Sequence, residues 1–161
     1  MPKIKAKEDG ISLIEVLVAI LIFAAGILSL VALQHSGISA VADAHQRSQA
    51  TAFANDIVDR MSANRAAAIA SHYNLYGQQV FNASSSCSST TSTCTPTQLA
   101  QMDLQEWSAN LANTLPDGRA WISNNDSRVT VVIGWNAAGA ALSADPSCGN
   151  DLVCIDVTVE I

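Results

Sequence analysis

The chain has 161 residues, of which 49% are hydrophobic and only 14% are charged, whereas a typical soluble domain has roughly 25% charged residues. The length suits a single domain. The apolar excess is concentrated between Val16 and Leu33, where no residue is charged, and a run of about 18 such residues is typical of a membrane helix. This composition argues against a cytosolic enzyme.

The net charge is −6, from 8 basic and 14 acidic residues. Three of the basic residues, Lys3, Lys5 and Lys7, precede the apolar run. By the positive-inside rule, the start of the chain then faces the cytoplasm, and the residues after Leu33 face outward. The remaining arginines are scattered among more numerous acidic residues and form no basic cluster. We therefore expect no binding of nucleic acid by the outward part.

The N-terminus allows two interpretations. A secretory signal peptide would combine the basic start and the apolar run with a cleavage site such as Ala42-Asp43-Ala44. However, the apolar run is longer than the roughly 7–15 residues of such peptides. Glu15 also lies in the first turn of the run, where a carboxylate is disfavoured, and ionisable groups in membrane segments are functional candidates. These features favour a helix that is retained in the membrane.

Residues 10–19, Gly-Ile-Ser-Leu-Ile-Glu-Val-Leu-Val-Ala, resemble the class III signal of type IV pilins and type II secretion pseudopilins. The resemblance implies that a prepilin peptidase cuts between Gly10 and Ile11 on the cytoplasmic side, and that Ile11 is then methylated at its nitrogen. It also makes Glu15 the fifth residue of the mature chain, which is glutamate in these families and which we expect to act in assembly. The first mature residue is usually phenylalanine in these families, and here it is isoleucine.

Residues 11 to about 70 contain no proline and only two glycines, Gly26 and Gly37, so we expect one long helix. Its first half is apolar on all sides. In its second half, an apolar stripe at helical spacing predicts a face that is buried against a globular head. The stripe consists of Ala50, Phe53, Ala54, Ile57, Val58 and Met61. Asp56 and Arg60 are spaced to form an ion pair along the helix.

Residues 84–97 are mostly serine and threonine, which predicts a loop because such a segment buries very little surface. Thr95, Pro96 and Gln98 then predict the start of a second helix, with threonine as N-cap and proline in the first turn. This helix is expected to run to about Thr114 and to end at residues 116–118, Pro-Asp-Gly. Its apolar side comprises Leu104, Trp107, Leu111 and Leu115.

Alternation of apolar and other residues with a period of two predicts strands at 129–135 and 153–161, each with one buried and one wet face. A shorter strand is expected at Arg119–Ser123, followed by a turn at 124–126. The predicted fold class is α+β, with a long N-terminal helix packed on a small antiparallel sheet. The predicted organisation is a cleaved leader at 1–10, a transmembrane and assembly helix at 11–34, and an extracytoplasmic head at 35–161.

The four cysteines, Cys87, Cys94, Cys148 and Cys154, all lie on the outward side. An even number of cysteines in an oxidising compartment favours disulfide bonds. Their spacings do not suit zinc, whose ligands are typically two to four residues apart within a pair. Four cysteines allow three pairings, and we favour the two local ones, Cys87–Cys94 and Cys148–Cys154.

The remaining residue types give no sign of chemistry performed by this chain. His35, His45 and His72 are far apart and are expected at the surface. The sequence contains no phosphate-binding loop, no nucleophile elbow and no cofactor motif. We therefore expect no catalytic residue, no metal and no cofactor. Three tryptophans, Trp107, Trp121 and Trp135, are interpreted as anchors of the core or the sheet.

Later segments extend the resemblance to the PilV-type minor pilins, which are also called type IV pilus modification proteins. These segments are residues 26–34, residues 59–65 (Asp-Arg-Met-Ser-Ala-Asn-Arg), Trp107 followed by Leu-Pro-Asp-Gly at 115–118, and a strand that ends in Trp135. They occur in the expected order and, together with the signal, cover most of the chain.

The resemblance implies a minor pilin that is held in the inner membrane, with its N-terminus cytoplasmic and its head periplasmic, until it enters the type IV pilus or the priming complex at its tip. Its partners would be other minor and major pilins, the prepilin peptidase and a tip adhesin, and its roles would be pilus assembly, cell adhesion and twitching motility. The alternative is a minor pseudopilin of a type II secretion system. A membrane-tethered periplasmic enzyme is the competing hypothesis from another class.

Overall fold

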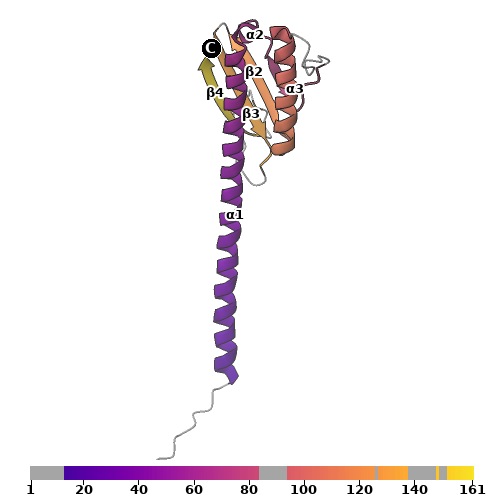
Figure 1. The fold of residues 1–161 in the computed structure, drawn as a ribbon. Coiled ribbons are helices and arrows are strands. Elements are labelled where there is room, and N and C mark those ends of the chain that lie inside the picture. Colours follow the sequence, from indigo (N-terminus) through magenta and orange to yellow (C-terminus); the bar gives the residue numbers. More distant parts are fainter. Residues whose placement is uncertain (1–12, 84–93, 126, 138–147, 149–151) are drawn as a thin grey trace, which may run out of the picture. The chain divides into compact units, whose positions relative to one another are not determined.

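The computed structural model describes residues 13–83, 94–125, 127–137, 148 and 152–161 (Figure 1). Its elements in chain order are α1 (Leu13–Ala63), α2 (Arg65–Ile69), β1 (Leu75–Gln78), α3 (Pro96–Thr114), β2 (Arg119–Asn125), β3 (Arg128–Trp135) and β4 (Val153–Glu160). The fold is α+β, as predicted. Contacts divide the chain into two compact units, Met1–Val41 and Ala42–Ile161. We call the second unit the head unit, and α1 contributes residues to both.

The expected single helix to about residue 70 is wrong at its C-terminal end, because α1 ends at Ala63 and a short α2 follows. The interruption lies at Asn64, whose backbone leaves the helical conformation at φ −116° and ψ 50°. The Asn64 side chain is buried, and its Nδ2 donates hydrogen bonds to the Pro96 carbonyl oxygen (2.7 Å) and to Tyr73 Oη (3.3 Å). These tertiary partners account for a break that no proline or glycine marks in the sequence.

The start of α3 is as predicted. Thr95 is the N-cap and Pro96 opens the helix. The Thr95 hydroxyl accepts a hydrogen bond from the Gln98 backbone N–H (3.3 Å), and the Thr95 backbone N–H donates to Gln98 Oε1 (3.0 Å). This reciprocal capping box satisfies backbone donors that the first turn of a helix otherwise leaves free. The expected loop at 84–97 lies largely outside the described residues.

The four strands form one antiparallel sheet in the order β1-β2-β3-β4. The strands β3 and β4 lie where the alternation predicted them, but only β4 shows the expected alternation of burial, because β3 is buried on both faces from Val131 to Trp135. Strand β1 was not predicted. The expected turn at 124–126 is wrong, because Asn124 and Asn125 continue β2 and pair with Val129 and Arg128. Asn124 is held in the strand by two hydrogen bonds, from its Nδ2 to the Ala68 carbonyl oxygen (2.6 Å) and from its backbone N–H to Asn74 Oδ1 (3.1 Å).

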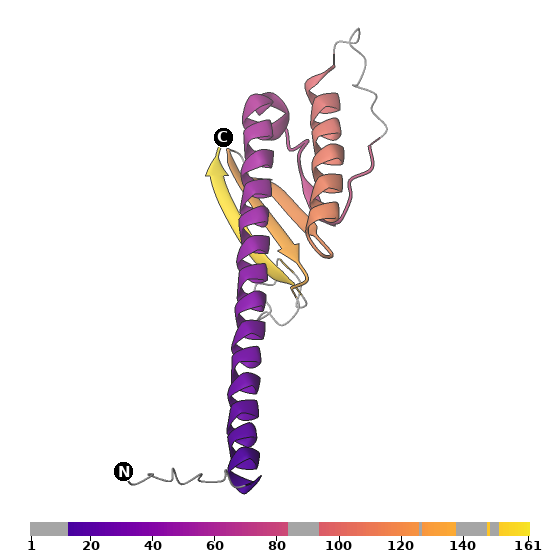
Figure 2. The same cartoon turned by 60° about the horizontal axis from the view of Figure 1, so that its bottom comes forward.

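In the head unit, the C-terminal part of α1 and the helix α3 lie on the same side of the sheet (Figure 2). The main core fills the space between these helices and that face. Its largest buried side chains are Trp107, Trp135, Tyr73, Ile57, Met61, Leu75, Leu104, Leu111, Leu115, Ile122 and Ile133. The predicted stripe of α1 and the predicted apolar side of α3 both contribute to it. Layered packing of this kind buries the apolar face of each element against another.

A second, smaller cluster lies on the opposite face of the sheet. It contains Val132, Cys148 and Leu152, with Trp121 and Cys154 packed against them. Gly134 allows this approach, because a Cβ at that position would lie 3.0 Å from Leu152 Cδ1 and 3.1 Å from Cys154 Sγ. The sheet therefore carries apolar contacts on both faces at the end of β3, where the sequence predicted a single buried face.

Candidate functional site

The first 29 described residues of α1, from Leu13 to Val41, are all exposed. We call this part the apolar stretch. Its exposed side chains include large hydrophobic residues on every side of the helix: Leu13, Ile14, Leu17, Ile20, Leu21, Ile22, Phe23, Leu28, Leu30, Val31, Leu33, Ile38 and Val41. The helix is long and apolar enough to cross a membrane. Soluble proteins rarely expose an apolar surface of this size, and such a surface marks a site of contact with lipid or protein.

Two hydroxyl groups within the apolar stretch are satisfied by the helix itself. The hydroxyl of Ser29 donates to the Ala25 carbonyl oxygen (3.0 Å), and the hydroxyl of Ser39 donates to the Ser36 carbonyl oxygen (3.0 Å). Helical backbone groups bond within the segment, which is the condition for placing a helix in an environment without water. The helical backbone and these two hydroxyl groups can therefore be surrounded by lipid or by other apolar helices without losing their hydrogen bonds.

Glu15 is the acidic residue of the first turn of α1. Its side chain is exposed, and within the described part of the chain it forms no hydrogen bond or ion pair. The first turn of a helix carries a partial positive charge that favours a carboxylate, which is a modest compensation for a charge among apolar neighbours. The predicted cleavage site, Gly10 and Ile11, lies outside the described residues.

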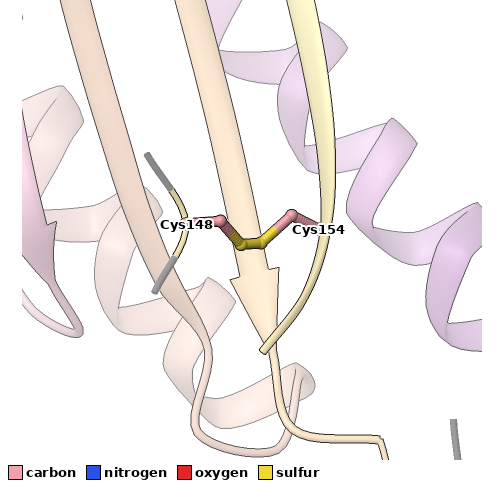
Figure 3. The surroundings of a disulfide bond; sticks show 2 residues. All are labelled: Cys148 and Cys154. Carbon is pink, nitrogen blue, oxygen red and sulfur yellow. A yellow bond between two sulfur atoms is a disulfide. The ribbon is translucent and has the colours of Figure 1, made fainter. Parts of the chain in front are cut away.

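The pair Cys148–Cys154 forms a disulfide bond, as predicted, with 6.4 Å between the two Cα atoms (Figure 3). Cys148 is fully buried on the far face of the sheet, and Cys154 belongs to β4. The bridge therefore ties Cys148 to β4. Cys94, next to the N-cap of α3, is also disulfide-bonded, but Cys87 lies outside the described residues, so the pairing Cys87–Cys94 stays a prediction.

A polar network that sequence reasoning missed joins α1, α3 and the segment after α2. Tyr73 Oη donates to Asp103 Oδ2 (2.6 Å), and Arg60 Nη1 donates to Asp103 Oδ1 (3.4 Å). Arg60 also pairs with Asp56 (3.2 Å), as the i,i+4 spacing predicted. Burial, and after it the hydrogen bond to Asp103, raises the pKa of Tyr73 above its ordinary value. Only the Asp56–Arg60 spacing was visible in the sequence, since the other partners are distant along the chain.

This network has the properties of a structural connection. Tyr73, Asn64 and Asp103 are almost completely buried. Tyr73 accepts a hydrogen bond from Asn64 and donates one to Asp103, so each polar group has a partner. Buried polar groups that are satisfied in this way fix one arrangement of the elements that carry them. The network therefore holds the end of α1 against the first turns of α3.

The other residues considered in the sequence lie apart from one another. His35, His45 and His72 are exposed, and the described residues contain no group of three histidine, cysteine or acidic side chains placed to hold a metal. Trp107 and Trp135 are fully buried, and their indole N–H groups donate to the Phe53 carbonyl oxygen (3.0 Å) and to Gln46 Oε1 (3.1 Å). These two tryptophans therefore anchor α1 to the core, in agreement with the predicted role.

Two family models match the chain. A model described as type IV pilin Tt1218 matches residues 32–105, and a model described as the prokaryotic N-terminal methylation motif matches residues 5–31. The two matches adjoin and run from residue 5 to residue 105. The second contains Gly10, Ile11 and Glu15. A search of curated proteins gave no match, and neither did a search of solved structures.

Proposed function

This chain belongs to the type IV pilin superfamily, a family of structural and non-enzymatic proteins, and from that membership we propose that it is a minor pilin of the PilV type. In this role it enters the type IV pilus, or the priming complex at its tip, and supports assembly and the presentation of an adhesin. A minor pseudopilin of a type II secretion system is the second candidate, because it shares the same processing signal.

One observation carries the proposal: every residue from Leu13 to Val41 is exposed, although most are apolar. For a monomer in water, each Å² of this apolar surface left uncovered would cost about 25 cal/mol of free energy. Lipid covers it before assembly, and neighbouring pilin helices cover it in the fibre. We place the N-terminus in the cytoplasm and the head unit in the periplasm, because the lysines precede the apolar run.

Glu15 is the residue to which we assign the docking step. Cleavage after Gly10 would create an ammonium group at Ile11, four positions before Glu15 in the sequence. In the membrane both charges are costly when isolated, and a contact between Glu15 of one subunit and the ammonium of its neighbour compensates both. An apolar surface without marked features slides easily, so this ion pair also sets the register between neighbouring helices.

Processing is tested by the substitution Gly10→Val. The peptidase must accommodate the backbone of residue 10 closely, so a branched side chain is expected to leave the leader attached. Mass spectrometry of the purified protein reads the N-terminus directly. A Gly10→Val protein that begins at Ile11 would show that the cleavage site has been misassigned.

Docking is tested by Glu15→Ala, with Asp59→Ala as the matched control, because Asp59 is an exposed acidic residue on the head-unit part of the same helix. We expect Glu15→Ala protein to be cleaved and folded but absent from sheared pili, whereas the Asp59→Ala protein is incorporated normally. Equal abundance of both variants in sheared pili would remove Glu15 from the docking step.

The choice between pilus and secretion system is tested in cells that lack the gene. We expect deletion to reduce surface pili, measured by mass spectrometry of sheared fibres, and to leave the export of secreted proteins unchanged. The opposite pattern, with normal pili and lost secretion, would identify a pseudopilin instead.

A further inference from the structure

The two edges of the sheet differ in how they are protected. At one edge, β1 has only four residues, and its register with β2 shifts between Tyr76 and Gln78, around Gly77 at φ +65°. At the other edge, β4 has eight residues and pairs with β3 without interruption from Val153 to Glu160. Short or bulged edge strands resist further pairing, whereas long regular ones invite it. Among the described strands, the edge formed by β4 is therefore the open one.

The outward backbone groups of β4 follow from the register. The Ile161 N–H donates to the Ser127 carbonyl oxygen (2.8 Å), which makes residues 161 and 127 a hydrogen-bonded pair. Such pairs alternate along an antiparallel ladder, so the odd-numbered residues of β4 bond to β3. The even-numbered residues, 154 to 160, direct their N–H and C=O groups away from β3. Among the described residues, β4 has a neighbouring strand on one side only.

The main core is also incompletely covered along β4. In β3, the core-facing residues Val131 and Ile133 have no exposed surface. In β4, their partners Val157 and Ile155 are only partly buried, as is Val159. An additional strand beside β4 would bring aliphatic side chains next to this row and bury it further. Backbone pairing and apolar burial would thus act at the same place.

The charge of this edge indicates which strand fits it. Asp156 and Glu160 are exposed on the far face of β4, and β4 contains no basic residue. Arg128 lies across the ladder from Glu160, and the Ser127 hydroxyl donates to Glu160 (3.4 Å), but Asp156 faces Val132. Opposite charges on neighbouring strands stabilise pairing, and like charges oppose it. A second copy of β4 would bring more carboxylates, so it is disfavoured.

We propose that the outer edge of β4 binds an extended strand of a partner protein in which aliphatic residues alternate with lysine or arginine. The aliphatic side chains lie over Ile155, Val157 and Val159 on the core side. The basic side chains lie beside Asp156 and Glu160 on the far side. Strand addition of this kind obtains affinity from main-chain hydrogen bonds and specificity from alternate side chains. The surface belongs to the head unit alone and does not depend on the proposed role in the pilus.

The probe is a fluorescent peptide as long as β4 in which valine and lysine alternate, and the full chain in detergent is the target. Binding is measured by fluorescence anisotropy. A peptide of the same composition, with valines and lysines in two blocks, is the sequence control. We expect the alternating peptide to bind and the block peptide to bind at least about tenfold more weakly, because only the first separates its aliphatic and basic faces.

Two further comparisons test the backbone pairing. Thr158→Pro removes one outward N–H from β4, and proline is tolerated in an edge strand where its nitrogen faces away from the ladder. We expect this variant to bind the alternating peptide roughly tenfold more weakly, and Thr158→Val to bind as wild type. The same test is applied to the wild-type chain with two peptides, one N-methylated at its odd-numbered amides and the other at its even-numbered amides. Only the peptide whose methylated amides face β4 is expected to lose binding.

Reversal of charge tests the choice of partner. The double variant Asp156→Lys and Glu160→Lys is expected to prefer a peptide that alternates valine with glutamate. The proposal is overturned if the alternating valine–lysine peptide does not bind, if both N-methylated peptides bind as tightly as the unmodified one, or if the glutamate peptide binds wild type equally well. It is also overturned if the chain itself forms a dimer that Thr158→Pro dissociates, because the occupant is then a second copy.

Discussion

Residues 13–41 and residues 42–63 are consecutive parts of α1, yet the first part has no buried residue, whereas the second contributes Ala50, Ala54, Ile57 and Met61 to the core. The two parts differ in content, since the first has one charged residue and the second has five, and they also differ in pattern. An apolar surface on every side of a helix has no preferred face, so it must be surrounded. A stripe at helical spacing has one face and specifies one neighbour. The comparison shows that the second part finds its partners within its own chain and that the first must find them elsewhere.

The largest expected effect comes from emptying the core of the head unit. Trp107→Ala should lower the free energy of unfolding by about 3–5 kcal/mol, because it removes a fully buried ring that contacts Phe53 edge-on and donates to the Phe53 carbonyl oxygen. The matched variant in the apolar stretch is Phe23→Ala, whose ring is 72% exposed. Denaturation of the detergent-solubilised chain, followed by circular dichroism, should show no change for Phe23→Ala. A similar loss for both variants would abolish the distinction between the two parts.

A smaller effect is expected from the disulfide bond on the far face. Replacement of both Cys148 and Cys154 by serine should lower the free energy of unfolding by roughly 2 kcal/mol, because the ring that the bridge closes is short. Use of the double variant in place of a reductant leaves Cys94 undisturbed. Unfolding curves at equal protein concentration measure the difference. An unchanged midpoint would show that the packing of Cys148 and Leu152 against the sheet does not need the bridge.

Alkaline pH should weaken the connection between α1 and α3. The pKa of Tyr73 is raised in the folded chain, so the folded state keeps a proton that the unfolded state releases above about pH 10. The contribution of Tyr73 to the free energy of unfolding is therefore complete below pH 10. It falls by up to about 1.4 kcal/mol per pH unit as the pH rises toward the pKa of the folded state. Tyr73→Phe should flatten this slope. Unfolding midpoints measured between pH 9 and pH 11 provide the test.

The smallest expected effect concerns the start of α3. Thr95→Ala removes the hydroxyl that accepts the Gln98 N–H and should cost about 1 kcal/mol, whereas Thr95→Ser retains the oxygen and should cost less. Both values come from the same denaturation assay. If alanine and serine are equivalent at this position, the capping box does not stabilise the head unit.

Local signals in the sequence predicted the features that depend on neighbouring residues. The capping box at Thr95 to Gln98, the stripe of α1 and the alternation in β4 each involve residues a few positions apart, and the structure contains all of them. Strand β3 lies where its alternation predicted it, although it is buried on both faces from Val131 to Trp135. The pairing Cys148–Cys154 was also favoured because it is local. Two parts of the candidate site, the apolar stretch and Glu15, could be recognised from the sequence. Hydropathy and a single charge can be read without knowledge of tertiary contacts.

The errors arose where distant residues decide the local structure. Asn64 ends α1 because its amide reaches Pro96 and Tyr73. Asn124 stays in β2 because Ala68 and Asn74 hold it, although asparagine is common in turns. Strand β1 is short and contains a glycine at positive φ, so its sequence has no alternation to detect. The Asp103 network is equally invisible, since its members are spread over more than forty positions.

The continuity of α1 has a mechanical consequence. The two units are joined by helix, from Leu13 to Ala63, and not by a loop, so tension on the apolar stretch reaches the head unit through the helical backbone. There the contacts that resist extraction extend from Ala50 to Met61, over roughly 16 Å. Two indole groups add restraints, at Gln46 and at Phe53. A pull along the helix loads these contacts together as a shear. The contacts of α1 with the core are therefore not broken one residue at a time.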